Sequence, residues 1–94
     1  MNNYIVSYDR GSVPAYRAFH DAFVKNPGIK SWWHYIKSCY IVKTTLSANE
    51  LSDHFTSCAK EAGIPTTHLV MKVDLKDRQG MLIKEAWAWM KVNG

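Results

Sequence analysis

The segment from residue 3 to residue 8 is the feature that most constrains the fold of this 94-residue chain. Its side chains alternate as they do in a β-strand, so Tyr4, Val6 and Tyr8 are predicted to face one side of a sheet. Ile5 and Ser7 are predicted to face the other side. A short apolar strand therefore opens the chain, and the segments that follow have to be arranged around a sheet.

Asp9 directly follows this strand and precedes the loop of residues 10–12. A carboxylate where a strand ends, on the rim of a sheet, is a common place to hold a metal or to meet a ligand. The same position is also ordinary for a solvated aspartate that forms a turn. Asp9 is therefore a candidate metal- or ligand-binding residue, with the structural role as the alternative.

Residues 29–45 are rich in β-branched and aromatic side chains, and this segment is long for one strand. We expect a hairpin with arms at 30–36 and 39–45 and a turn at Lys37-Ser38. A single bent strand is the alternative, because Lys-Ser is a poor pair for a tight hairpin turn.

Two amphipathic helices are predicted on either side of this hairpin. Residues 13–25 have helical spacing of large apolar side chains. Ser47 and Glu50 form an S-x-x-E capping box, which predicts the start of the second helix. Gly63 and Pro65 are expected to end it. The side chains predicted on its apolar face are Leu51, Phe55, Cys58 and Ala62.

The last part of the chain predicts a strand at 68–75 and a helix at 83–92. Trp87 and Trp89 are two positions apart, so on a helix they are not expected to face the same core. At least one of them should be exposed or packed on a partner. The side chains predicted on the apolar side of this helix are Ile83, Ala86, Trp87 and Met90.

This order of elements predicts a single α+β domain over residues 1–94. It is the order of a ferredoxin-like βαββαβ fold, with an antiparallel sheet, two helices on one face and an added C-terminal helix. The other face has no helix except the last one, so it is a ready surface for a homodimer. The aromatic content of 13% supports an interface or a groove, with dense filling of a small core as the alternative.

Charge and cysteine content restrict the class of protein further. The net charge of +4 permits an acidic partner such as nucleic acid but does not require one, and the chain has no run of Lys or Arg. Cys39 and Cys58 lack the paired spacing of a metal site and fit a reducing compartment. No apolar stretch approaches the length of a membrane helix, and the N-terminus has no signal pattern. We therefore expect a cytoplasmic protein with no membrane partner.

Aromatic and basic side chains gather on the predicted hairpin. Aromatic rings beside cations hold single-stranded nucleic acid by stacking. Protein–protein contacts use the same residue types as anchors, and we favour this second interpretation. His34 is also a conceivable general base beside Asp9, or an ordinary strand residue. The candidate binding residues are Tyr8, Arg10, Lys30, Trp32, Trp33, His34, Tyr35, Lys37, Tyr40 and Lys43.

The opening N-Y-I-V-S-Y-D resembles the small ferredoxin-like subunit of the CRISPR spacer-adaptation complex and its stand-alone relatives, the SinR-type small proteins. Residues 32–38 and 39–44 are similar to the hairpin of their second and third strands. Residues 47–51 resemble the start of their second helix, and residues 84–89 resemble their closing segment.

This resemblance implies a homodimer in which each subunit contributes an Asp at the end of its first strand. In the adaptation subunits that Asp, matched here by Asp9, can hold a divalent metal between protomers for phosphodiester cleavage. The resemblance thus makes Asp9 the candidate catalytic residue and the candidate Mg²⁺ ligand of a metal-dependent nuclease. Without nuclease activity, we expect no cofactor. Other members act as scaffolds for nucleic acid or protein. This chain departs from the adaptation subunits in its helical tail and in Arg10, where an apolar residue is more usual. Arg10 is expected either to pair with Asp9 and leave the metal site empty, or to contact a phosphate.

The function expected from the sequence is that of a small, dimeric, non-catalytic binding module. Its partner is expected to be nucleic acid, or a protein or ribonucleoprotein of a nucleic-acid-targeting system. The first alternative is a metal-dependent endonuclease that uses Asp9 at the dimer interface. The second is an inhibitor of a host defence complex, encoded by a virus or a mobile element.

Overall fold

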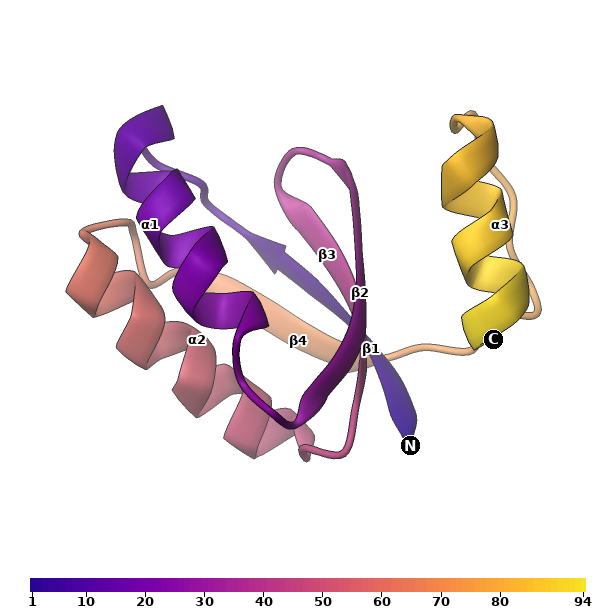
Figure 1. Ribbon diagram of the computed structural model, residues 1–94, viewed down its shortest axis with the longest axis horizontal. Helices are drawn as coiled ribbons and strands as arrows, with labels where there is room; N and C mark the ends of the chain where they lie inside the picture. Colours follow the sequence, from indigo (N-terminus) through magenta and orange to yellow (C-terminus); the bar gives the residue numbers. More distant parts are fainter.

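One antiparallel sheet separates two layers of helices in the computed structural model, which describes all residues from 1 to 94 (Figure 1). Two helices lie on one side of the sheet and the third lies on the other. The α+β class is confirmed, with four strands and three helices. In chain order the elements are β1 (Asn2–Tyr8), α1 (Val13–Val24), β2 (Ile29–Ile36), β3 (Cys39–Thr44), α2 (Ala48–Ala62), β4 (His68–Lys72) and α3 (Lys84–Asn93).

The strands lie in the order β2-β3-β1-β4, so β1 is a central strand that pairs antiparallel with both β3 and β4. Because a central strand is covered on both faces, its alternation decides which side chain enters which layer. Tyr4, Val6 and Tyr8 are buried in the cluster that α1 and α2 form with the sheet. Ile5 packs on the opposite side, against the cluster beneath α3. The predicted alternation of the opening strand is confirmed.

The hairpin predicted in the middle of the chain is also confirmed. β2 and β3 pair antiparallel around a turn at residues 37–38, so the alternative of one bent strand is wrong. The pairing shifts register between Ile29 and Ser31 and again between Trp33 and Ile36. Such irregularities increase the local twist of a strand pair.

The capping box at the start of α2 is present as predicted. The Ser47 hydroxyl accepts from the Glu50 amide at 3.1 Å, and the Ser47 amide donates to the Glu50 carboxylate at 3.0 Å. The helix ends at Gly63, whose φ of 82° is a left-handed conformation that favours glycine. The fully buried side chains of α2 are Leu51, Phe55, Cys58 and Ala59. The predicted Ala62 is partly buried and packs against the same cluster, so the predicted apolar face is confirmed, with Ala59 added to it.

β4 is shorter than the predicted strand and ends at Lys72. β4 ends there because its partner strand β1 begins at Asn2. The amide of Val73 donates to the carbonyl of Asn3, next to the first residue of β1. Beyond this point the chain has no strand to pair with. It turns instead toward the second layer, where Leu75 is buried.

The third helix lies on the other sheet face, where it packs on β2. Ala86 and Met90 form its buried stripe and enclose Trp33 and Ile41 of the sheet. Ile83 precedes the helix and is 58% exposed, so its predicted place on the apolar side is wrong. None of the three helices has the length and apolar composition that are needed to cross a bilayer.

Trp87 and Trp89 correct a second expectation for this helix. Both are half-buried, and both pack against the same cluster, although they are two positions apart. Their large rings reach in from the two sides of the narrow stripe that Ala86 and Met90 form. The Trp89 indole also donates to the Ser31 hydroxyl at 2.8 Å. Neither ring therefore requires a partner to cover it.

Candidate interaction surface

α3 covers only part of its sheet face. The registers place Met71, Ile5, Ile41 and Trp33 in one row across the four strands, and Leu69, Ser7, Cys39 and Ile36 in the next row. In the first row, α3 covers the side chains at the β2 end, where Trp33 lies, but not those at the β4 end. The helix leaves the second row uncovered. We call this uncovered area the open sheet face and define it by Ile5, Ile36, Cys39, Leu69, Met71 and Met81.

The side chains on the open sheet face are large and exposed. Leu69 is 58% exposed, Met71 51% and Ile36 50%. Met81, in the segment between β4 and α3, is 97% exposed. With roughly 200 Å² for a fully exposed large side chain, these four alone present on the order of 500 Å² of apolar area. This value lies toward the upper end for the largest apolar patch on a monomer, about 300–600 Å², and such patches often mark interaction sites.

A groove of about 280 Å³ runs along the boundary between the open sheet face and the segment that leads to α3. Eight of its ten lining residues are hydrophobic, and none is charged. The lining residues are Ile5, Trp33, Ile36, Cys39, Ile41, Gln79, Gly80, Met81, Leu82 and Met90. The Cys39 thiol is the one nucleophile in the lining, and burial raises its pKa. Because the lining contains no acid or base beside it, the groove is suited to receive apolar side chains and not to perform a reaction.

On the opposite sheet face, five side chains form what we call the Tyr–His cluster: Tyr8, Tyr16, His20, His34 and Tyr40. The Tyr40 hydroxyl lies 2.5 Å from Nδ1 of His20 and 2.6 Å from the Tyr16 hydroxyl. The Tyr16 hydroxyl lies 3.3 Å from each ring nitrogen of His34. The cluster thereby joins α1 to β1, β2 and β3 through polar contacts.

The hairpin turn closes the far end of the Tyr–His cluster. The Tyr8 hydroxyl donates to the Lys37 carbonyl at 3.1 Å, and Nε2 of His34 lies 3.1 Å from the same oxygen. Burial raises the pKa of the Tyr8 and Tyr40 hydroxyls above that of a free tyrosine, so both stay protonated. Burial, followed by the nearby His34, lowers the pKa of His20, while Asp21 acts in the opposite direction.

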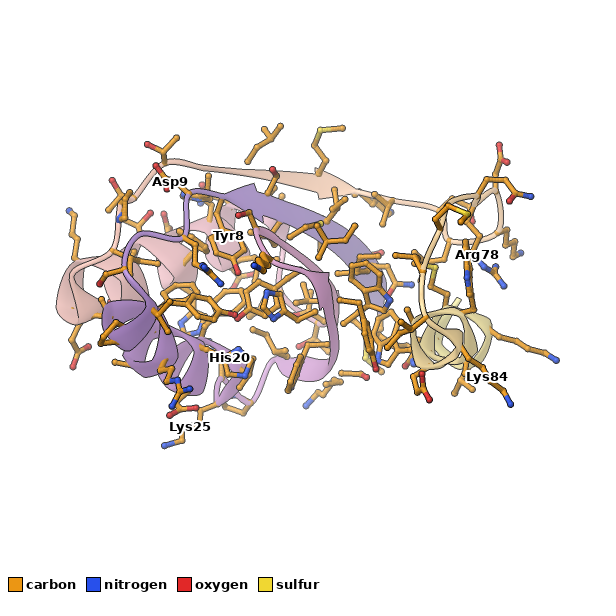
Figure 2. All side chains as sticks on the ribbon, turned by 90° about the horizontal axis from the view of Figure 1, so that it is seen from above. Tyr8, Asp9, His20, Lys25, Arg78 and Lys84 are labelled. Atoms are coloured by element: carbon orange, nitrogen blue, oxygen red, sulfur yellow. The ribbon has the colours of Figure 1, made fainter.

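Three of the predicted binding residues lie in the core, so their assignment to a contact surface is wrong. Tyr8 is 6% exposed, Trp33 2% and Tyr40 0%. The reason is the strand alternation: Tyr8 and Tyr40 point toward α1 and α2, whereas Trp33 points toward α3. Figure 2 shows Tyr8 on the side of β1 that faces the α1 layer.

The exposed members of the predicted hairpin site do not share one surface. Trp32 is 41% exposed and meets the ring of His20 on α1, at 4.8 Å between ring centroids. Tyr35 is 42% exposed and contacts Trp33 on the other face of the sheet, at 5.4 Å. His34 is half-buried between them, and its ring nitrogens are engaged within the Tyr–His cluster. The hairpin therefore offers two separate aromatic contacts and no continuous stacking platform.

The predicted cationic residues are also dispersed. Lys30 and Lys37 are exposed at opposite ends of β2, roughly 20 Å apart at about 3.3 Å per strand residue. Lys43 is half-buried on β3, opposite Asn3 and Ser31. The Arg10 guanidinium lies over the ring of Tyr16, 5.7 Å from its centroid. Arg10 is therefore engaged with the aromatic cluster.

Asp9 lies where β1 ends, as predicted, and is exposed (Figure 2). Its amide donates to the Thr67 carbonyl at 3.3 Å, which ties the start of the loop to the segment before β4. No group of three or more His, Cys, Asp or Glu side chains is assembled to hold a metal ion. Mg²⁺ requires several oxygen ligands. The residues around Asp9 in one subunit therefore do not fit a Mg²⁺ site.

The remaining histidines have defined partners. Nε2 of His68 lies 2.7 Å from the Ser52 hydroxyl, and its Nδ1 lies 2.7 Å from the Thr66 carbonyl, so Ser52 donates to Nε2. This Ser–His pair joins α2 to β4, and neither residue lines a groove or pocket. His54 meets the Phe23 carbonyl at 2.8 Å and joins α2 to α1.

Two groups of residues escaped the sequence reasoning. Leu69 and Met71 of the open sheet face alternate with Val70, and this alternation was the available signal. Tyr16 and His20 recur with Phe19 and Phe23 on the apolar stripe of α1, where a polar tip on a buried stripe indicates a hydrogen-bonded interior. None of three comparisons with known proteins gives a match, whether with family models, curated proteins or solved structures.

Proposed function

We propose that this chain is a non-catalytic binding module that forms a homodimer through its open sheet face. The observation that carries the proposal is the exposure of Leu69, Met71, Ile36 and Met81 beside an uncharged apolar groove. A second copy is the occupant that best matches this surface. An apolar face without charges is complementary to itself, and a two-fold axis buries the same patch on both subunits. Its apolar area approaches the scale of a standard interface, about 800 Å² per partner including the rim.

We further propose that the fold is ferredoxin-like, βαββαβ with an added C-terminal helix. The order of the elements and the strand order β2-β3-β1-β4 support this assignment. The similarity to SinR-type proteins and to the CRISPR adaptation subunit remains part of the proposal. On that basis the dimer would act in a nucleic-acid-targeting system, in the cytoplasm, where the free thiols of Cys39 and Cys58 are stable.

The partner of the dimer that we favour is a protein or ribonucleoprotein. The burial of Trp33, Tyr8 and Tyr40 removes the rings that would stack bases. Nucleic acid is the second candidate, which the exposed Trp32 and the net charge of +4 support.

The test of dimerisation is sedimentation velocity over a range of concentrations. The variant Leu69→Glu places a charge on the β4 side of the open sheet face and is expected to sediment as a monomer. Val13→Glu is the matched control, because Val13 is 51% exposed and lies on α1, on the opposite side of the sheet. A wild-type protein that stays monomeric, or a dimer that persists in Leu69→Glu, would contradict the proposal.

The partner class is tested in the same instrument. Short single- and double-stranded DNA and RNA are added at low and at moderate salt. A complex that weakens steeply with salt would assign nucleic acid as the partner. A dimer that binds none of these nucleic acids agrees with a protein partner.

A further inference from the structure

Met81 is the most exposed large apolar side chain of the molecule, at 97%, although it lies well inside the chain. The segment that carries it, between β4 and α3, runs alongside α3 (Figure 1). This segment is anchored on both sides of Met81. The Arg78 guanidinium donates to the Leu75 carbonyl at 2.7 Å, and Leu82 packs against the cluster beneath α3. The Met81 side chain is therefore held in water at a defined position.

The apolar groove lies directly beside Met81, which forms part of its rim. Its buried lining residues are Trp33, Ile41 and Met90, so these side chains form its floor. The groove has a volume of about 280 Å³ and no charged residue in its lining. The other recess of the molecule lies between α1 and α2, on the opposite side of the sheet. An apolar projection and an apolar recess are thus neighbours on one face.

We propose that Met81 of each subunit inserts into the apolar groove of the other subunit, an inference that rests on the homodimer proposed above. A two-fold axis that passes between a projection and a recess places each projection in the recess of the partner. Both insertions then form together, and no free copy of either surface is left to recruit a third subunit. A second copy of this chain is therefore the occupant of the groove.

Met81 has to be accommodated wherever two open sheet faces meet. A side chain that projects beside the face holds the two subunits apart, unless the partner has a recess at the matching position. An empty groove in the interface would also leave its lining atoms without packing partners. Insertion fills the groove and removes the exposed area of Met81 from water, which favours association.

Methionine is chemically suited to this contact. Its unbranched side chain has three rotatable bonds and adapts to a recess of irregular shape, and its sulfur packs favourably against aromatic rings. Trp33 is the aromatic residue in the lining of the groove. Gln79 is the one residue of the lining with a polar amide side chain, and neither side of the contact carries a charge. No ion therefore has to lose its hydration when Met81 inserts.

The experiment uses two variants of the full chain that damage opposite halves of the contact. Met81→Ala removes the inserting side chain and leaves the groove open. Cys39→Met narrows the groove with an apolar side chain and leaves Met81 in place, since Cys39 is half-buried in the lining. Each variant homodimer loses both insertions. Its dissociation constant in sedimentation velocity is expected to rise about 100-fold, or about tenfold for each insertion.

Two further variants serve as controls for these dissociation constants. Met81→Leu keeps a large apolar side chain and is expected to dimerise nearly as tightly as the wild-type protein. Val92→Ala removes another exposed apolar side chain, 79% exposed on α3 and outside the groove, and should leave dimerisation unchanged.

Equal amounts of Met81→Ala and Cys39→Met are then mixed, and the dimers are counted by native mass spectrometry. A mixed dimer regains one insertion, because the Met81 side chain of one subunit meets the open groove of the other. With a tenfold gain from that insertion, mixed dimers are expected to make up about nine-tenths of all dimers, compared with about half for random pairing. Insertion of Met81 into the groove of its own subunit would give no such preference.

The outcomes separate the insertion from the homodimer itself. Random pairing in the mixture, or a wild-type dissociation constant in Met81→Ala, would overturn the insertion while the homodimer stands. A wild-type protein that stays monomeric would overturn both. If Cys39→Met fails to fold, Ile36→Trp narrows the same groove from β2, where Ile36 is 50% exposed, and is read in the same way.

Discussion

Trp32 and Trp33 are neighbours on β2 and point to opposite faces of the sheet. Trp33 is 2% exposed, and its indole donates to the Ala86 carbonyl at 3.2 Å, so it has both apolar and polar partners in the layer of α3. Trp32 is 41% exposed, with one edge on His20. At the scale of single residues, burial and not residue type therefore decides what each ring contributes.

The two tryptophans are expected to respond very differently to truncation. Trp33→Ala removes a buried ring and leaves a cavity, which should lower the free energy of unfolding by about 3–5 kcal/mol. Trp32→Ala should lower it by about 1 kcal/mol. Urea denaturation followed by circular dichroism measures both values. The loss expected for Trp33→Ala is a large fraction of the free energy of unfolding of a small domain, so Trp33→Phe serves as a milder second variant. Equal losses at the two positions would contradict this packing.

Asp9 gives the residue-scale test of the endonuclease hypothesis. Its carboxylate is exposed, so Asp9→Ala should change the free energy of unfolding by no more than about 0.5 kcal/mol. If the protein cleaves nucleic acid with Mg²⁺, the same variant should abolish cleavage. Asp77→Ala, at another exposed carboxylate, is the control in the nuclease assay. Cleavage that survives in Asp9→Ala would exclude Asp9 as the metal ligand.

At the scale of the element, α2 has the most completely defined ends in the chain. Its N-terminus has both hydrogen bonds of the capping box, and its C-terminus has the left-handed Gly63, whose amide donates to the Ala59 carbonyl at 2.9 Å. These contacts involve residues that are at most four positions apart. Local sequence therefore suffices to specify where this helix begins and ends.

The cap of α2 is expected to contribute measurably to stability. Ser47→Ala removes the hydroxyl that accepts from the Glu50 amide and should lower the free energy of unfolding by about 1 kcal/mol. Ser57→Ala is the matched control, because Ser57 is an exposed residue inside the same helix. That change should be neutral or slightly stabilising, since alanine has the higher helix propensity. Thermal denaturation of the two variants distinguishes these outcomes, and a greater loss in Ser57→Ala would contradict the role of the cap.

The same locality explains what the sequence could predict and what it could not. The strand alternation of residues 3–8, the hairpin turn and the capping box are short-range patterns, and the structure confirms them. The end of β4 depends on where β1 begins, which is a long-range property. The predicted binding site was wrong at Trp33 and Tyr40 because their burial is also a long-range property. The alternation shows that neighbouring side chains point to opposite faces of the sheet. Whether a face is buried at Trp33 or Tyr40 depends on where α1 and α3 pack.

At the scale of the whole molecule, the sheet has two apolar faces, and they are covered to different extents. Thirteen buried residues form the cluster beneath α1 and α2, whereas five form the cluster beneath α3. The small cluster leaves the open sheet face beside it exposed. The molecule therefore combines one complete core with one partial core, and the partial core adjoins the surface through which we propose that it dimerises.

This asymmetry means that α3 should detach while the rest of the fold persists. Ala86 is fully buried against Trp33, so Ala86→Arg forces a charged side chain into the small cluster and should displace α3. Trp33 and Ile41 would then become exposed beside the open sheet face, which should increase the binding of a hydrophobic dye. The helical signal in circular dichroism should decrease only by the contribution of the ten residues of α3. Ala88→Arg adds the same charge on the exposed side of α3 and should change neither signal. Complete unfolding of Ala86→Arg, or equal dye binding by the two variants, would show that the two layers of the molecule do not separate in this way.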